Sequence, residues 1–473
     1  MIALRLPDLA GVVDGAVEGD NSEDAVVTAP ATIDSRAVDA GGLFVALPGE
    51  HVDGHDFVAA AVANGAAAAL VDRPVDAPHV LVPDVLAALS RLARWLVDRL
   101  AADGLVVVGI TGSSGKTSTK DVIAQLLAAA GPTVATKGNF NNEIGLPVTV
   151  TRADEATRFL VLEMGARGVG HIADLCRVAP PRIGVELNVG TAHASEFGSR
   201  EATAEAKAEL VAALPSAADG GVAVLNVDDP LVAAMAGRTT ARVVGVGTGA
   251  TATVRATGVR LDDRGRASYD LRVEGQAPVA VTLPLHGAHH VGNSLAAAAV
   301  ALEAGLAPRR VAELLGSVTM PSRWRMEVVD RPDGVTVVND SYNANPESVR
   351  AAIEALVAMS AGRRAWAVLG EMLELGAASP DEHDRVGRLA RGSGVARVVA
   401  VGEGARAVHD GALAAGAGDG EESVLVPDVP AAVALLEAQL RPGDVVLVKA
   451  SRGAGLDRVA AALLDGVTTG SGS

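Results

Sequence analysis

Short apolar runs alternate with longer amphipathic or Ala-rich stretches along much of the chain, as strands and helices do when they follow one another. Residues 105–108 form a continuous apolar run between two glycines, which is typical of a buried parallel strand. A helical pattern over 117–130 follows and stops at Gly131-Pro132. Further patterns predict strands at 159–162, 183–189 and 222–225, and a mostly helical stretch at 287–315.

A second alternation begins near residue 321, with helical stretches between the apolar runs. One helix is expected to begin at Asn345-Pro346, a capping residue followed by proline, and another at Ser379, with capping-box spacing to Glu382. The predicted strands are 335–338, 365–369, 398–401, 423–426 and 445–448. Two regions of strand–helix alternation predict two α/β domains with parallel sheets.

The first hundred residues form a third region. A strand-like run at 43–47, an Ala-rich helical stretch at 57–69 and a long helix at 85–101 are expected there. The length of 473 residues, at about 150 residues per domain, also suggests about three domains. We therefore expect an α/β protein with three domains, at 1–102, 103–320 and 321–473.

Composition narrows the function classes. The formal charge of −17 argues against a nucleic-acid scaffold, and only ten aromatic residues argue against stacking platforms for bases. The single cysteine, Cys176, excludes an internal disulfide and fits a reducing compartment. No apolar run reaches the ~18 residues of a membrane span, and the N-terminal residues do not form a secretory signal. We expect a cytoplasmic protein without a membrane span.

The segment from Gly109 to Thr117, Gly-Ile-Thr-Gly-Ser-Ser-Gly-Lys-Thr, lies between a predicted strand and a predicted helix. Glycines let backbone N–H groups turn toward a phosphate, Lys116 supplies positive charge and Thr117 can hold Mg²⁺. Gly109 lies one residue too far from Gly115 for the strict phosphate-loop spacing. The alternative, a Gly-rich loop with an incidental lysine, is less favoured because strand, helix and Lys-Thr are all in place.

Three further residues could complete such a site. Glu163 ends a predicted strand, where a carboxylate can help hold the metal, although it could be an ordinary strand-end acid. Lys207 shares an apolar helix face with Leu210 and Leu214, so it either extends to solvent or is buried as a reactive neutral amine. His193, after the strand at 183–189, could bind a metal or cap a loop. The histidines at 286, 289 and 290 lack the partners of a structural zinc site.

Two polar segments follow predicted strands of the last domain. They are residues 339–346, Asn-Asp-Ser-Tyr-Asn-Ala-Asn-Pro, and residues 449–453, Lys-Ala-Ser-Arg-Gly. Open α/β sheets bind ligands at the carboxyl ends of their strands. Capping and turn formation explain Asn345, but they do not explain Lys449 at the end of an apolar strand.

Together these segments resemble the Mur ligase family, the ATP-dependent amide-forming enzymes of peptidoglycan precursor synthesis. The matching motifs occur in family order over nearly the whole chain: Thr111–Thr117, Glu163-Met-Gly, Asn188-Val-Gly with His193, Ala206-Lys-Ala-Glu, Leu225-Asn-Val-Asp-Asp-Pro, and Gly287-Ala-His with Asn293. The forms Asn139–Pro147, Asp340–Pro346 and Gly370–Gly376 resemble the member that adds D-alanyl-D-alanine. His290 and Glu371 depart from that pattern, where Asn and Asp are commoner.

The resemblance implies a uridine-nucleotide-binding N-terminal module, a central P-loop ATPase domain and a Rossmann-like C-terminal domain. It implies that ATP is bound by Gly112, Ser113, Ser114, Gly115, Lys116, Thr117, Ser118, Asn139, Asn293, Arg325 and Asp340. It implies that the UDP-N-acetylmuramoyl-tripeptide and D-alanyl-D-alanine substrates are bound by Ser35, Arg36, Asn142, Glu143, Tyr342, Asn343, Asn345, Lys449, Ser451 and Arg452.

The resemblance also implies two Mg²⁺ ions, with Thr117, Glu163, His193 and Lys207 at the metal sites. Lys207 is expected to be carbamylated, and Lys116, Lys207 and His193 are the expected catalytic residues. A monomer is expected. The alternatives are another amino-acid ligase of the family, a folylpolyglutamate-synthetase-like ligase, or, outside the ligases, a P-loop nucleotide switch, although no guanine-reading Asn-Lys-x-Asp motif is found.

Overall fold

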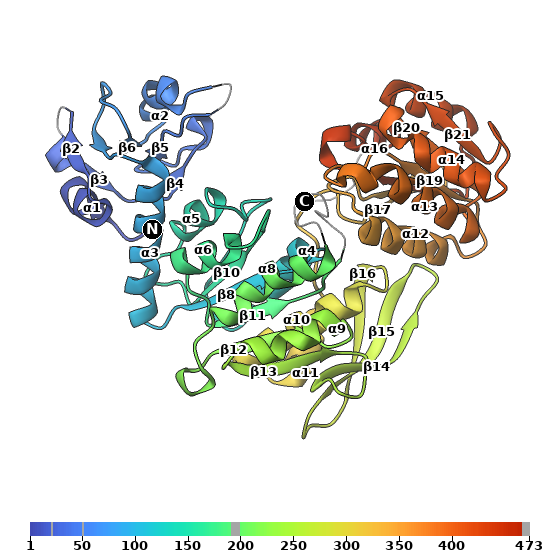
Figure 1. Ribbon diagram of the computed structural model, residues 1–473, viewed down its shortest axis with the longest axis horizontal. Coiled ribbons are helices and arrows are strands. Elements are labelled where there is room, and N and C mark those ends of the chain that lie inside the picture. The colour runs from blue at the N-terminus through green and yellow to red at the C-terminus, as the bar shows by residue number, and fades with distance from the viewer. Residues whose placement is uncertain (20–21, 50–51, 191–198, 466–473) are drawn as a thin grey trace.

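The computed structural model describes residues 1–19, 22–49, 52–190 and 199–465. Three β-sheets, each with helices packed against it, form three lobes (Figure 1). Their strands fall within residues 16–81, 106–286 and 327–449, and we call these parts the N-terminal, central and C-terminal lobes. The predicted α/β class and the repeated strand–helix alternation are therefore confirmed.

The N-terminal lobe contains a five-stranded sheet in the order β2-β7-β6-β5-β4. All neighbouring strands are parallel except β2, which runs antiparallel to β7. The strands are β2 (Ala16–Glu18), β4 (Ala31–Thr32), β5 (Leu43–Val45), β6 (Ala68–Val71) and β7 (His79–Leu81), beside a short pair, β1 (Leu4–Arg5) and β3 (Val26–Val27). The helices are α1 (Leu6–Val13), α2 (Val58–Ala63) and α3 (Val85–Ala102).

The helix predicted over 57–69 is only partly correct. Helix α2 ends at Ala63, Gly65 adopts a positive φ of 111°, and the chain then enters strand β6, whose four residues are all buried. Alanine favours a helix locally, but burial between two parallel strands outweighs that preference. Helix propensity alone therefore misplaced residues 64–69 of this stretch.

The central lobe contains a nine-stranded sheet in the order β16-β15-β14-β13-β12-β11-β8-β10-β9. Strands β8 to β14 run parallel, whereas β14, β15 and β16 form an antiparallel extension that the sequence patterns did not indicate. The strands are β8 (Val106–Thr111), β9 (Thr133–Ala135), β10 (Phe159–Glu163), β11 (Ile183–Glu186), β12 (Val222–Asn226), β13 (Arg242–Gly247), β14 (Val254–Leu261), β15 (Arg266–Val273) and β16 (Val279–His286).

Helices cover this sheet on both faces. Helices α4 and α10 pack against each other on one face, and α8 packs against α6 and β11 on the other. The helices are α4 (Lys116–Ala128), α5 (Gly145–Val150), α6 (His171–Val178), α8 (Arg200–Ala212), α9 (Pro230–Ala234), α10 (His290–Glu303) and α11 (Pro308–Leu315). Strand β8 lies between β10 and β11, so the connection after β8 runs toward one edge of the sheet and the connection after β10 runs toward the other. Open α/β sheets bind ligands at such a point, beside the carboxyl ends of the strands.

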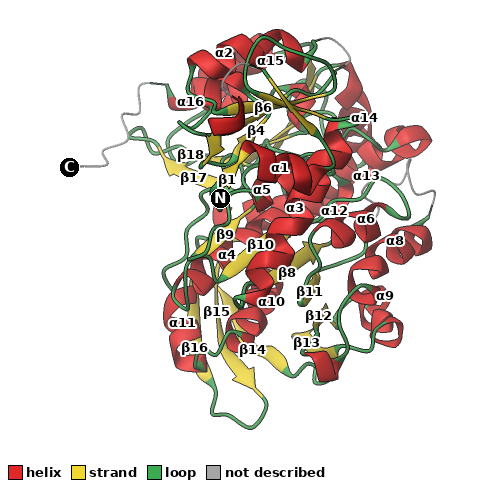
Figure 2. Cartoon of the chain, turned by 90° about the vertical axis from the view of Figure 1, so that its left-hand side faces the viewer, coloured by secondary structure: helices red, strands yellow, loops and turns green. Residues whose placement is uncertain are grey.

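Helix α3 joins the N-terminal and central lobes. It packs against α1 on one side and against α5 and α6 on the other, so that a single hydrophobic cluster includes residues of both lobes (Figure 2). In the described part of the chain, neither α3 nor any other helix has both the length and the apolarity needed to cross a bilayer.

The C-terminal lobe contains a six-stranded sheet in the order β17-β18-β22-β19-β20-β21, parallel except for the edge strand β17. The strands are β17 (Glu327–Asp330), β18 (Thr336–Asn339), β19 (Ala365–Leu369), β20 (Arg397–Val401), β21 (Ser423–Val426) and β22 (Val445–Lys449). The helices are α12 (Pro346–Ser360), α13 (Ser379–Gly392), α14 (Arg406–Ala414), α15 (Val429–Gln439) and α16 (Asp457–Leu464). One hydrophobic cluster lies on each face of the sheet.

The two helix starts predicted in this lobe differ in outcome. Asn345 caps α12 as expected: its Oδ1 accepts from the Ser348 backbone N–H, and the Ser348 hydroxyl closes the capping box. The capping box predicted at Ser379 is wrong, because Ser379 is already the first residue of α13. Its carbonyl oxygen instead lies 2.7 Å from the His383 Nδ1.

Candidate active site

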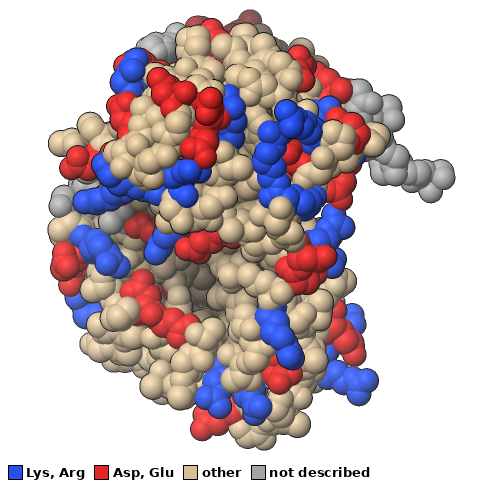
Figure 3. Space-filling model, turned by 90° about the vertical axis from the view of Figure 1, so that its right-hand side faces the viewer, with Lys and Arg blue, Asp and Glu red and all other residues tan. Residues whose placement is uncertain are grey.

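A cavity of about 1000 Å³ lies between the central and C-terminal lobes. Its walls come from the carboxyl ends of β8, β10, β11 and β12 on one side, and from the segments after β18, β19 and β22 on the other. A space-filling view shows a hollow on one face of the molecule, rimmed by both acidic and basic side chains (Figure 3). Polar groups from segments far apart in the sequence thus share one enclosed space.

The loop between β8 and α4 has the geometry of a phosphate cradle. Gly115 precedes α4 with a φ of 80°, and a Cβ there would lie 2.8 Å from the Asn293 Oδ1, so only glycine fits. The Lys116 ammonium donates to the Gly112 carbonyl oxygen at 2.8 Å, and the Ser114 N–H donates to the Asn188 Oδ1 at 2.9 Å. These bonds fix the loop at the positive end of α4, where an anion is favoured.

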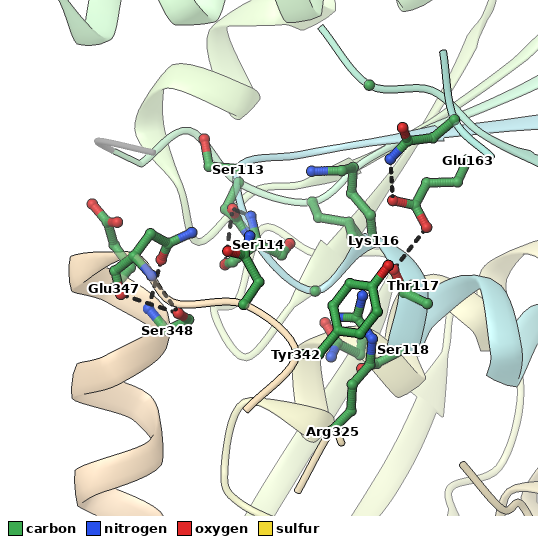
Figure 4. A pocket seen from close by; sticks show the side chains of 18 of the residues that line it. Ser113, Ser114, Lys116, Thr117, Ser118, Glu163, Arg325, Tyr342, Glu347 and Ser348 are labelled. Carbon is green, nitrogen blue, oxygen red and sulfur yellow. Dashed lines mark hydrogen bonds between the residues drawn. The ribbon is translucent and has the colours of Figure 1, made fainter. Parts of the chain in front are cut away.

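Thr117 and Glu163 meet beside this loop (Figure 4). The Thr117 hydroxyl donates to the Glu163 Oε2 at 2.8 Å, and the Asn141 Nδ2 donates to the Glu163 Oε1 at the same distance. Glu163 is buried, and its own N–H donates to the Thr136 hydroxyl. A hydroxyl oxygen and a carboxylate therefore meet here, and both are oxygen ligands of the kind that Mg²⁺ prefers.

Lys207 is buried on α8, with only 3% of its surface exposed. The interpretation in which its ammonium extends to solvent is therefore wrong. Burial lowers the pKa of the Lys207 amine well below its ordinary value, and the nearby Lys116 charge lowers it further. Glu186, the last residue of β11, is fully buried, and burial raises the pKa of its carboxyl against the opposing effect of Lys207.

Neither carboxyl oxygen of Glu186 has a hydrogen-bond partner among the described residues. A buried carboxylate without hydrogen-bond partners is costly, which is the physical reason that the pKa of Glu186 is raised. Glu209, two residues after Lys207, accepts bonds from the backbone N–H groups of Gly170 and Ala173 and so ties α8 to the first turn of α6.

The C-terminal lobe contributes a buried ion pair. The Lys449 ammonium lies 2.6 Å from the Asp340 Oδ2 and also donates to the Asn343 carbonyl oxygen at 2.8 Å. The second Asp340 oxygen accepts from the Met326 N–H at 3.2 Å. Lys449 thus holds the segment that follows β18, a role that capping and turn formation in the sequence did not explain.

Aromatic and guanidinium groups stack at the junction of the lobes. The Arg325 guanidinium carbon lies 4.1 Å from the centre of the Tyr342 ring, and that of Arg452 lies 5.6 Å from Tyr342 and 5.7 Å from Trp324. Trp324 and Met326, on either side of Arg325, have φ values of 61° and 50°, a strained conformation for such side chains. Two of the few aromatic residues are therefore held against arginines here.

Most residues singled out from the sequence line this cavity: Ser113, Ser114, Gly115, Lys116, Thr117, Ser118, Asn139, Asn142, Glu143, Glu163, Lys207, Asn293, Arg325, Asp340, Tyr342, Asn343, Asn345, Lys449, Ser451 and Arg452. Gly112 contributes the carbonyl that holds Lys116. Ser35 and Arg36 lie apart, in a turn of the N-terminal lobe where Arg36 is exposed and paired with Asp34. His193 lies outside the described residues.

Sequence reasoning missed several polar residues of the site: Asn141, His171, Glu186, Asn188 and Glu374. Asn141, Asn188 and Glu374 stand in motifs that were noted. Only the fold shows that Asn141 and Asn188 hold Glu163 and the phosphate loop, and that Glu374 lines the cavity. His289 and His290 also line the cavity, with ring centres 4.2 Å apart. Across the described segments, no group of three or more His, Cys, Asp or Glu residues has a metal-binding arrangement.

Three parts of the sequence match models of known protein families. Residues 110–301 match the Mur ligase middle domain, residues 324–452 match the Mur ligase glutamate ligase domain, and residues 31–95 match the catalytic domain of the Mur ligase family. The chain belongs to the Mur ligase family.

Individual relatives narrow the comparison. The chain is 50% identical, over 100% of its length and 99% of the relative's, to the UDP-N-acetylmuramoyl-tripeptide–D-alanyl-D-alanine ligase of Mycobacterium tuberculosis. It is 34% identical to the ligase of that name from Escherichia coli, over 99% of this chain and 100% of the relative. A crystal structure of MurF from Acinetobacter baumannii is similar with a TM-score of 0.86 and 29% identity, covering 98% of this chain and 99% of that one. MurF ligase from Thermotoga maritima in complex with ADP is similar with a TM-score of 0.79 and 30% identity, covering 93% and 98%.

Proposed function

We propose that this protein joins D-alanyl-D-alanine to UDP-N-acetylmuramoyl-tripeptide through an ATP-dependent amide bond. The observation that carries the proposal is the single cavity in which the phosphate loop and the Thr117–Glu163 pair face Asp340 and Lys449 of the other lobe. The full-length similarity to ligases of that name supports the choice of substrates. The reaction belongs to peptidoglycan precursor synthesis.

In this proposal the loop residues from Gly112 to Ser118 bind the phosphates of ATP through backbone N–H groups and the Lys116 ammonium. Asn139, Asn293 and Arg325 contact the nucleotide, and Asp340 holds the ribose. Burial lowers the pKa of Lys116, while the Glu163 and Glu374 charges raise it. An anionic phosphate beside Lys116 favours its charged form, so nucleotide binding and a cationic Lys116 support each other.

The residues around Glu163 fit a magnesium ion. The Thr117 hydroxyl and the Glu163 carboxylate are oxygen donors 2.8 Å apart at the edge of the phosphate loop. These two side chains would hold the ion, and the nucleotide phosphates would supply further oxygen ligands. When bound, Mg²⁺ neutralises charge that develops on the transferred phosphoryl group. We assign a second Mg²⁺ to His193 and Lys207.

We also propose that Lys207 is carbamylated. A carbamate forms only on a neutral amine, and the lowered pKa of Lys207 makes that form available. The added carboxylate would lie near Glu186, and the raised pKa of the Glu186 carboxyl favours its neutral form, which would reduce repulsion between two anions. Conversion of a buried cation into a metal-supporting anion explains why a lysine occupies an apolar helix face.

The proposed reaction has two steps. The terminal carboxylate of the tripeptide attacks the γ-phosphate of ATP, which gives an acyl phosphate and ADP. The amine of the dipeptide then attacks the acyl carbon, and phosphate leaves. Ser35 and Arg36 hold the uridine nucleotide in the N-terminal lobe, while Asn142, Glu143, Tyr342, Asn343, Asn345, Ser451 and Arg452 contact the substrates nearer the cavity.

We assign residues 1–102 to the uridine-nucleotide module, 103–320 to the ATPase domain and 321–473 to the C-terminal domain. Because ATP and the C-terminal residues lie on separate lobes, closure of the lobes brings the reactants together and keeps water from the acyl phosphate. We further propose a monomer that works in the cytoplasm, where ATP is available. Light scattering of the purified protein tests the oligomeric state.

Phosphate release measured with ATP, Mg²⁺ and the UDP-tripeptide tests the function. D-Alanyl-D-alanine should stimulate release strongly, and the UDP-pentapeptide should appear by mass spectrometry. Single amino acids such as D-glutamate or diaminopimelate serve as controls for the other ligases of the family. Slow phosphate release that no amine stimulates would point to a nucleotide switch instead.

A further inference from the structure

The loop after β19 reaches the cavity with an unusual backbone. Glu374 has a φ of 65°, in the left-handed region that side chains other than glycine and asparagine rarely adopt. Its neighbours fix this conformation: Met372 and Leu375 are buried, and the Met372 N–H donates to the His383 Nε2 at 2.8 Å. A strained residue held so firmly in a cavity wall is typical of a functional position.

A second loop is bonded to the first. The Leu373 N–H donates to the Ser451 hydroxyl oxygen at 2.9 Å, and the Ser451 N–H donates to the Glu371 carbonyl oxygen at 3.0 Å. Both loops line the cavity and bring three different chemistries together there: the carboxyl group of Glu374, the exposed apolar side chain of Leu373 and the guanidinium of Arg452. These chemistries match an ammonium, a methyl group and a carboxylate.

Glu374 also influences the lysine of the phosphate loop. Burial lowers the pKa of Lys116, and the charges that raise it are those of Glu163 and Glu374. Glu163 belongs to the central lobe and is bonded to Thr117 and Asn141. Glu374 is a carboxylate of the C-terminal lobe whose charge raises the pKa of Lys116, and both residues line the same cavity.

The other carboxylates of the cavity wall lie on other segments. Glu143 precedes α5, Asp174 lies on α6, Asp228 follows β12, Asp340 follows β18 and Glu347 lies on the first turn of α12. None of these belongs to the two bonded loops that carry Leu373 and Arg452.

We propose that Glu374 binds the ammonium of the incoming dipeptide and accepts one of its protons, while Arg452 binds the dipeptide carboxylate and Leu373 contacts a methyl group. The inference rests on the proposed ligase function and deepens it. It assigns the amine-substrate subsite to Leu373 and Glu374 of the first loop and to Arg452 of the second.

The proton balance is complete within this step. The ammonium gives one proton to the Glu374 carboxylate and becomes a neutral amine. The amine nitrogen forms a bond to the acyl carbon, and the carbon–oxygen bond to phosphate breaks. The leaving phosphate takes the second proton from nitrogen, so that the products are the amide, hydrogen phosphate and a protonated Glu374.

Glu374→Gln tests the proposal because it keeps the shape of the side chain and removes the charge. We expect kcat/KM for D-alanyl-D-alanine to fall by about 10² or more, in the range of lost general-base catalysis. Hydroxylamine, which is uncharged at neutral pH, traps an acyl phosphate without a base. Formation of the UDP-tripeptide hydroxamate should therefore stay within about threefold of wild type.

Three further proteins make the result decisive. Glu374→Gly suits the positive φ and removes the carboxylate. It should therefore fold, lose ligation of the dipeptide and keep formation of the hydroxamate. Glu374→Asp should recover part of the ligation. Glu371→Gln removes a charge from the same loop, on a side chain that lies beside Gly404 and outside the cavity wall, and should behave as wild type.

Wild-type kinetics for the dipeptide in Glu374→Gln would overturn the proposal. An equal loss of ligation and hydroxamate formation would also overturn it, because Glu374 would then serve the first step. Failure of the ligase function itself has a different signature, since the wild-type protein would then release no phosphate in response to the dipeptide.

Discussion

Thr117, in the first turn of α4, donates a 2.8 Å hydrogen bond to Glu163, the last residue of β10. Strands β8 and β10 are paired in parallel, so the residues that follow them emerge at the same edge of the sheet. The fold thus brings together a hydroxyl and a carboxylate that are distant in sequence.

Glu163→Gln should raise the Mg²⁺ concentration needed for half-maximal phosphate release by at least about tenfold, and lower kcat by about 10². The amide keeps the size of the side chain but loses the charge that a divalent cation needs. A Mg²⁺ titration of the variant measures both effects. The exposed Glu155→Gln serves as the control, and an unchanged Mg²⁺ requirement in Glu163→Gln would remove Glu163 from the metal site.

Lys207→Ala should lower kcat by about 10² or more, because the proposed carbamate and its support of the metal site are lost together. Acetate or propionate should restore part of the activity by placing a carboxylate in the vacated space, and neither should stimulate wild type. Lys207→Arg should not be rescued, since its side chain still fills the space. Full activity of Lys207→Ala would exclude any catalytic need for this lysine.

Acid should destabilise the protein through His290. Burial, and then the charges of His289 and His286, lower the pKa of His290 well below its ordinary value of 6.5. The unfolded chain therefore binds a proton that the folded chain does not. Stability from this group is fully present above pH 6.5 and falls as the pH drops below it, by about 1.4 kcal/mol per pH unit.

His290→Asn removes this group while keeping a side chain that forms hydrogen bonds. Burial also lowers the pKa of His289, while the charge of Asp340 raises it and the charge of Lys449 lowers it. Part of the acid sensitivity should therefore remain in the variant. Urea unfolding at pH 7.5, 6.0 and 5.0 compares the two proteins. Identical pH dependence would show that His290 is protonated in the folded state.

Cys176 should resist thiol reagents in the folded protein. It is buried on α6 with its Sγ 3.8 Å from the Met164 Sδ, and burial raises the pKa of its thiol to about 12. The thiolate that reacts is therefore scarce as well as enclosed. A disulfide reagent at pH 8 should label the thiol only in denaturant, and rapid stoichiometric labelling of the native protein would contradict this.

The sequence predicted those parts of the site that are local in the chain. The phosphate loop could be recognised because its glycines, lysine and threonine are adjacent and stand between a strand and a helix. Glu163 was identifiable from its place at the end of an apolar strand. The contact between these two features required the pairing of β8 with β10, which no single segment encodes.

Glu186 shows why the rest was missed. Its strand has the pattern of an ordinary apolar run, and nothing local indicates that its carboxyl is fully buried and has no hydrogen-bond partner among the described residues. The antiparallel strands β14, β15 and β16 were also missed. In β14 the alternation of buried and exposed residues stops after Thr257, where a register shift interrupts its pairing with β15, whereas buried residues occur at every second position in much of β15 and β16.

The strained residues beside Arg325 have an energetic consequence. Trp324 and Met326 are held in left-handed conformations in the segment that leads into β17, while Arg325 between them stacks on Tyr342. A rearrangement that relaxes this segment releases free energy, on the order of 1–3 kcal/mol per residue. A ligand that binds Arg325 and lets Trp324 and Met326 relax would gain this free energy, so its affinity would depend on the conformation of this segment.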